Sequence, residues 1–212
     1  MEKERRFNNE IEVRELDDGT KVIAGYAIVF NSESNDLGGF KEVIKPGSLR
    51  NADMTDVVAL FNHDSNIPLG RVPGTLNLTT TKKGLRYEIT PPDTQAARDL
   101  ITSIERGDVK GSSFGFTIAK DGDEWKEPED RDGTWMRYIY GFDRIFDVSP
   151  VVYPAYSATD TTVAKRELGT MRDKKEREET EQIELEKQKL ELERKKIVSP
   201  MNEWLDKHKL ED

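Results

Sequence analysis

Residues 109–119 read VKGSSFGFTIA, a stretch in which two serines lie between glycines at the start of an alternating apolar run. Alternation with a period of two predicts a β-strand. The preceding residues, 91–108, predict a helix with a cap at Asp93 or Thr94 and an end at Gly107. Its apolar stripe consists of Ala97, Leu100, Ile101 and Ile104. The two serines therefore lie between a helix and a strand that follows it.

Most of the remaining body predicts β-structure, because short alternating runs are separated by turn residues. These runs cover residues 10–16, 21–30, 75–81, 84–90, 113–119 and 135–142. A second, shorter helix is expected after Pro46, in GSLRNAD. The expected fold class is α+β and mainly β, with a charged helical tail at the C-terminal end.

Composition limits the possible functions. The 212 residues carry a net charge of −9, which argues against a nucleic-acid-binding surface because phosphate contacts need clustered Lys and Arg. The chain has no cysteine, which excludes disulfides, thiolate zinc sites and cysteine nucleophiles. Neither a signal peptide nor a membrane span is evident, so we expect a soluble protein made in the cytoplasm, without membrane contact.

The last 48 residues differ from the body. Residues 165–212 contain 14 acidic and 13 basic residues, a net −1 that leaves −8 for the rest. We expect domains at 1–164 and 165–212. Residues 173–198 predict a long helix that ends at Pro200, followed by a short terminal helix. Ile183, Leu190 and Ile197 form one thin stripe, and Leu185 and Leu192 another. This pattern fits a solvated single helix, and a coiled-coil or docking segment is the alternative.

The residues GSSFG, 111–115, match the G-x-S-x-G pattern of the α/β-hydrolase nucleophile elbow, with Ser113 in its centre. The context contradicts that interpretation. An elbow needs a strand before the serine and a helix after it, and here the order is reversed. The catalytic histidine of such hydrolases also follows the serine, whereas His208 in the charged tail is the only one after Ser113.

A different order, His63, Ser113 and Asp147, is chemically reasonable. Imidazole accepts a hydroxyl proton near neutral pH and returns it to a leaving group, and a third group must orient it. The alternatives are a surface-turn histidine and a strand-end carboxylate satisfied by backbone amides. Strand alternation puts Ser112 and Ser113 on opposite faces without choosing between them. Gly111 and Gly115 are expected to leave room for a peptide beside Ser113.

Residues 121–133, DGDEWKEPEDRDG, form an acidic stretch that predicts a solvated hairpin loop. Calcium binding is the alternative, but the ligand spacing of an EF-hand is absent. We therefore expect no metal and no cofactor.

Five segments resemble the prohead serine protease family of tailed bacteriophages, in family order and over about residues 10–160. They are GYAIVFNSES, FKEVIKPGSL, VALFNHD, GDVKGSSFGF and DVSPVVYPAY. The resemblance implies that His63 is the general base and that Ser113, directly before FGF, is the nucleophile. It places an acidic residue at Asp147. The family is similar in fold to herpesvirus assemblins, which implies a closed β-barrel core with flanking helices.

Assemblins use a second histidine as the third triad member. This body has none, so an acid, or a dyad without a third member, must serve here. The resemblance also implies a homodimeric serine endopeptidase inside the viral prohead in the host cytoplasm, which cleaves scaffold, major capsid protein and itself. The tail would then dock to scaffold or be a self-cleaved extension. The alternative is a non-enzymatic scaffolding protein with a β-rich binding domain and a self-associating tail.

Overall fold

The computed structural model describes residues 4–8, 11–128, 133–153 and 162–207. The chain divides into two compact units, Met1–Val163 and Ala164–Asp212. The boundary predicted after residue 164 lies beside this division. That the two parts are functional domains stays a prediction.

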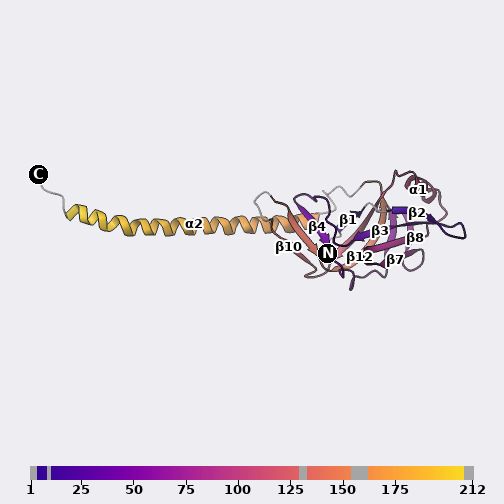
Figure 1. The fold of residues 1–212 in the computed structure, drawn as a ribbon, viewed down its shortest axis with the longest axis horizontal. Coiled ribbons are helices and arrows are strands. Elements are labelled where there is room, and N and C mark those ends of the chain that lie inside the picture. Colours follow the sequence, from indigo (N-terminus) through magenta and orange to yellow (C-terminus); the bar gives the residue numbers. More distant parts are fainter. Residues whose placement is uncertain (1–3, 9–10, 129–132, 154–161, 208–212) are drawn as a thin grey trace. The chain divides into compact units, whose positions relative to one another are not determined.

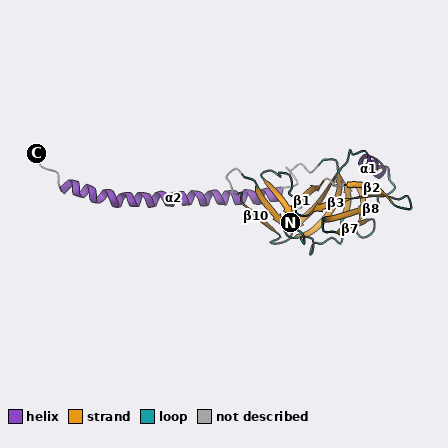
Figure 2. Ribbon diagram, viewed as in Figure 1, coloured by secondary structure: helices purple, strands orange, loops and turns teal. Residues whose placement is uncertain are grey.

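The first unit is mainly β, as predicted, and its described strands form three sheets (Figure 2). The five-stranded sheet has the order β1 (Glu4–Asn8), β9 (Gly111–Ile118), β12 (Phe142–Val151), β5 (Val58–Phe61) and β6 (Asp64–Arg71). The four-stranded sheet has the order β2 (Ile11–Glu15), β3 (Lys21–Val29), β8 (Gly84–Ile89) and β7 (Leu76–Thr80). The three-stranded sheet has the order β10 (Asp123–Lys126), β11 (Trp135–Ile139) and β4 (Phe40–Ile44).

The closed barrel expected from the resemblance is not found among the described residues. A barrel needs its first and last strands to pair. Here each sheet keeps two edge strands, for example β1 and β6 in the five-stranded sheet. The coarser expectation, an α+β fold that is mainly β, is correct.

Helix α1 (Gln95–Glu105) agrees with the sequence prediction and packs on β2 (Figure 1). Thr94 caps its N-terminus, with Oγ1 accepting from the Ala97 N–H at 3.3 Å. At the C-terminus Gly107 adopts φ = 81°, and the N–H of Asp108 donates to the Ser103 carbonyl, as in a Schellman motif. The predicted stripe is largely buried.

The prediction of a helix after Pro46 is wrong. Residues 46–51 form successive turns, in which Ser48 and Arg50 donate to the carbonyls three residues earlier. Gly47 has φ = 92°, a left-handed conformation that a right-handed helix cannot include.

The core of the first unit lies between the sheets, and one face of β9 supplies much of it. Phe114 and Phe116 stack with ring centroids 4.9 Å apart. Phe142 of β12 meets both rings edge-on, at 5.9 and 5.0 Å. All three side chains are buried. Aromatic pairs in this geometry add to the stabilisation from burial alone.

Helix α2 (Thr162–Lys207) is continuous, shown in orange to yellow in Figure 1. Pro200 does not end it, contrary to the prediction, because the helix continues to Lys207. Ion pairs four residues apart support it, Lys174–Glu178 at 3.7 Å and Glu191–Lys195 at 3.0 Å. The separate terminal helix is likewise not observed up to Lys207, and residues 208–212 lie outside the described residues.

The two apolar stripes of α2 are exposed where their side chains are described. Ile183, Leu185, Leu190 and Leu192 are 51–70% exposed. This fits the solvated helix, and the docking alternative stays a prediction. Neither α1 nor α2, over their described residues, is long and apolar enough to cross a membrane.

Candidate active site

His63 lies in the two-residue turn of the hairpin formed by β5 and β6. The pair Phe61–Asp64 closes the hairpin, and Asn62 and His63 have φ of 51° and 59°. Positive φ at both central residues is what the twist of adjoining strands requires in a two-residue turn of type I′. Asn and His tolerate this conformation better than most residues. The predicted turn is therefore present, but only 8% of the His63 side chain is exposed.

Asn62 ties this turn to the end of β12. Its backbone N–H donates to the Pro150 carbonyl at 3.0 Å, and its side-chain oxygen accepts from the Val152 N–H at 3.0 Å. These two hydrogen bonds, one from the backbone of Asn62 and one to its side chain, hold the turn against the end of β12. Asn62 was not singled out by the sequence analysis.

The two serines of β9 point to opposite faces, as the alternation predicted. Ser112 Oγ lies 2.6 Å from the hydroxyl of Tyr87 on β8, and both residues are fully buried. Burial raises the pKa of the Tyr87 hydroxyl, and the hydrogen bond with Ser112 only partly offsets that effect. Tyr87 therefore stays protonated and holds Ser112 in the core. Ser113 faces the other way.

A β-bulge in β12 puts Asp147 on the face of Ser113. Ile145 pairs with Phe116, whereas Asp147 pairs with Gly115, so one extra residue, Phe146, lies between the two pairs. Side chains that are directly opposite in an antiparallel ladder share a face. Without the bulge, Asp147 would share the core face of Ile145, since residues two apart do. Bulges re-aim side chains in this way.

His63 contacts both other candidates. Its Nε2 lies 2.6 Å from Ser113 Oγ, and its Nδ1 is hydrogen-bonded to Asp147 Oδ1. An ionised carboxylate can only accept, so Nδ1 carries the proton and Nε2 accepts from the serine hydroxyl. The structure thus brings together all three residues predicted from sequence: Ser113 lies on β9, Asp147 on the adjacent β12, and His63 in the turn that follows β5 of the same sheet.

Ser149 is a fourth polar side chain here, and sequence reasoning missed it. Its Oγ lies 3.3 Å from both His63 Nδ1 and Asp147 Oδ1. Ser149 is paired with Ser113 in the β9–β12 ladder and is fully buried. Its position two residues after Asp147 was a signal available in the sequence, because such residues share a strand face.

The site is closed to solvent. Ser113 is 0% exposed and Asp147 1%. That Gly111 and Gly115 leave room for a peptide stays a prediction, and the backbone of β9 is paired on both sides. Strand β1 pairs with residues 112–116 and β12 with residues 111–118.

The acidic stretch 121–133 is partly strand, contrary to the loop prediction. Within it, β10 pairs with β11, and the Asp123 carboxylate accepts from Arg137 Nε at 2.5 Å. Residues 129–132 lie outside the described residues. Among all residues that the structure describes, no group of three or more His, Asp or Glu side chains could hold a metal ion.

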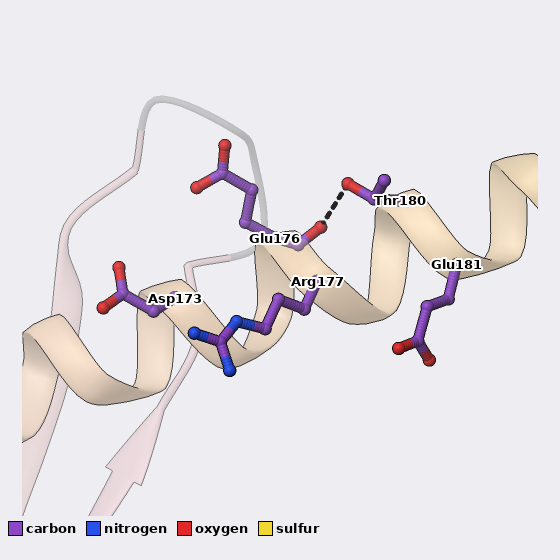
Figure 3. A pocket seen from close by; sticks show the side chains of 5 residues that line it. All are labelled: Asp173, Glu176, Arg177, Thr180 and Glu181. Carbon is purple, nitrogen blue, oxygen red and sulfur yellow. Dashed lines mark hydrogen bonds between the residues drawn. The ribbon is translucent and has the colours of Figure 1, made fainter.

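A surface hollow along α2 offers no catalytic constellation. Figure 3 shows its lining, which comes from a single helix: Asp173, Glu176, Arg177, Thr180 and Glu181. The Thr180 hydroxyl donates to the Glu176 carbonyl at 2.7 Å, a bond internal to the helix. The chemistry of the described residues therefore concentrates around His63.

Comparisons with known proteins show the family of the chain. The model of the caudovirus prohead serine protease family matches residues 9–174. The prohead protease of Enterobacteria phage HK97 is 37% identical over 120 residues, which are 53% of this chain and 50% of that protein. The chain thus spans about half the length of this curated relative.

A solved structure of the bacteriophage T4 capsid assembly protease is a more distant match. It has a TM-score of 0.38 and 12% identity, over 70% of this chain and 98% of that one. This likeness is too distant to bear on function.

Proposed function

The chain belongs to the caudovirus prohead serine protease family, and from this premise we propose that it is a serine endopeptidase of the immature capsid. Its substrates would be segments of the scaffold and of the major capsid protein, together with its own chain. Ser113 is the nucleophile, His63 the general base and Asp147 the group that orients the base. The single observation that carries this assignment is the His63 ring, which contacts Ser113 and Asp147 through opposite nitrogens.

The reaction follows from these contacts. Ser113 Oγ attacks the scissile carbonyl while its proton passes to His63 Nε2. The imidazolium that forms is stabilised by Asp147, and its proton then goes to the leaving amine as the C–N bond breaks. In the second half a water molecule gives a proton to Nε2 and attacks the acyl ester. Its cleavage releases the new carboxyl end and restores the Ser113 hydroxyl.

The choice of Ser113 over Ser112 rests on their different partners. Ser112 is bound to Tyr87 on the core side of β9. Ser113 lies against the imidazole nitrogen that can accept a proton. A nucleophilic hydroxyl needs such a base within hydrogen-bond reach.

The test is the intact mass of the full chain, alone and co-expressed with its phage's scaffold or coat protein. Wild type and Ser112→Ala are expected to yield fragments, and Ser113→Ala is expected to yield none. Uncut chains in all three, with coat protein present, would contradict the protease and favour the scaffolding alternative. Cleavage that survives Ser113→Ala but is lost in Ser112→Ala would overturn the choice of serine.

Homodimerisation, location inside the prohead and the role of the tail complete the proposal, and the family resemblance supports them. Sedimentation of the purified chain tests the dimer. Deletion of residues 170–212 tests the tail. The deletion is expected to reduce incorporation into proheads or to remove a self-cleavage product. Normal incorporation and normal processing after the deletion would contradict both roles.

A further inference from the structure

We propose that Ser149 is a positioning residue, which keeps the His63 imidazole in the tautomer and orientation that activate Ser113. The inference rests on the proposed function. It concerns a side chain outside the predicted triad, on the same strand face as Asp147 and directly opposite Ser113 in the ladder.

The distances around Ser149 indicate where its hydroxyl donates and where it accepts a hydrogen bond. Its oxygen is 3.3 Å from Asp147 Oδ1 and 3.3 Å from His63 Nδ1. The carboxylate accepts only, so the Ser149 O–H donates to Asp147. A lone pair of the same oxygen is then left for the Nδ1–H of His63. The three groups form a triangle in which each contacts the other two.

This triangle favours the productive tautomer. With the proton on Nδ1, the ring donates toward two acceptors, Asp147 and Ser149. With the proton on Nε2, the bare Nδ1 lone pair would face the carboxylate, and Ser113 would lose its acceptor. Ser149 also donates to Asp147, which is buried and needs donors to remain a carboxylate there. The hydroxyl thus acts on the ring directly and through the carboxylate.

The same contacts exclude Ser149 as the nucleophile. The nitrogen that it faces already carries a proton, so that nitrogen cannot take another from a serine. Ser113 lies closer to the ring, at 2.6 Å, and faces the free lone pair of Nε2. Ser113 and Ser149 both contact the imidazole, but only Ser113 faces a nitrogen that can accept a proton.

The first measurement is ¹⁵N NMR of His63 in the full chain. The chain has two histidines, so His208→Gln leaves a single imidazole to observe. In this background the Nδ1–H tautomer is expected to dominate, and Ser149→Ala is expected to raise the Nε2–H fraction measurably. Ser149→Thr keeps the hydroxyl and is expected to keep the tautomer of the wild-type residue.

The second measurement is the rate at which a fluorophosphonate labels Ser113, followed by intact mass and peptide mapping. Loss of a hydrogen bond to a charged group predicts labelling about 10- to 100-fold slower in Ser149→Ala. The matched control is Ser48→Ala. Ser48 is also a buried serine, its Oγ has no hydrogen-bond partner among the described residues, and its loss is expected to leave the rate unchanged.

The two measurements separate this inference from the proposed function. If wild type is labelled no faster than Ser113→Ala, the protease proposal fails, yet the tautomer of His63 still reports on Ser149. If Ser149→Ala has the same ¹⁵N shifts and the same labelling rate as wild type, the positioning role is overturned. A slower rate with unchanged shifts and a lower melting temperature means that Ser149 is merely structural. An adduct mapped to Ser149 overturns the assignment as well.

Discussion

Asp147 lies directly opposite Gly115 in the ladder between β9 and β12, so the carboxylate shares a strand face with a residue that has no side chain. Ser113 is two residues from Gly115 on the same strand and therefore lies on that face too. The His63 ring lies between the serine and the carboxylate and contacts both.

Replacing Asp147 by Asn tests the orienting role. An amide can donate to Nδ1, which would favour the Nε2–H tautomer and leave Ser113 without an acceptor. We expect turnover to fall by about 10⁴-fold, as measured by fragment formation. Asp56→Asn removes a carboxylate from an exposed pair with Arg71 and is the control, expected to cleave normally. Comparable cleavage by both variants would contradict the role of Asp147.

Substitutions of Asn62 separate two contributions to the stability of the His63 turn, the clamp formed by the Val152–Asn62 hydrogen bond and the positive φ of residue 62. Asn62→Ala loses the acceptor for the Val152 N–H and disfavours φ = 51°, so we expect the chain to be about 1–3 kcal/mol less stable. Asn62→Gly tolerates the dihedral and loses only the acceptor, whereas Asn62→Asp keeps both. Urea unfolding should rank Asp above Gly and Gly above Ala. An Ala variant as stable as wild type would show that the clamp is unimportant.

A buried charge cluster predicts how stability depends on pH. Glu42 accepts from Arg6 and Arg137, and all three are buried. Burial by itself raises the pKa of the Glu42 carboxyl, but the Arg6 guanidinium, followed by that of Arg137, holds the pKa below its ordinary value. A lowered pKa gives stability that is present above the ordinary value of about 4.3 and is lost as pH falls through the folded-state pKa.

We therefore expect Glu42→Gln to lower the unfolding free energy near neutral pH by about 3–5 kcal/mol, because two buried guanidiniums lose a partner. The loss of stability on acidification below about pH 4.5 should also become shallower. Urea unfolding at several pH values measures both effects. Glu33→Gln, in an exposed pair with Lys41, should change neither. An unchanged pH dependence in Glu42→Gln would contradict the stabilising role of this carboxylate.

The burial of Ser113 predicts that its reactivity depends on opening. Because its side chain is 0% exposed, a fluorophosphonate must wait for a local fluctuation. We expect slow labelling of the isolated chain that accelerates at urea concentrations well below the unfolding midpoint. His63→Ala should remain unlabelled under the same conditions. Fast labelling that is indifferent to urea would indicate that the closed site is not the predominant state in solution.

Local pattern determined much of this protein. The stripe in residues 97–104 and the glycine at 107 specify helix α1, since helical periodicity and its end are encoded in neighbouring residues. The alternating runs indicated most of the strands in the same way. The candidate residues Ser113, His63 and Asp147 also came from sequence. His63 is the single histidine of residues 1–164, and the family resemblance implied Ser113 as the nucleophile and an acidic residue at Asp147.

The tertiary structure decided what depends on distant partners. Ser112 is hydrogen-bonded in the core to Tyr87, which belongs to another sheet, and Ser113 is the serine that contacts His63. The extra residue Phe146 moved Asp147 from the core face to that of Ser113, against the period of two. Whether sheets close into a barrel is likewise set by which edges pair. Periodicity is local, whereas strand pairing and bulges are chosen by residues tens of positions away, and for that reason the sequence proposed the candidate residues and only the fold brought them together.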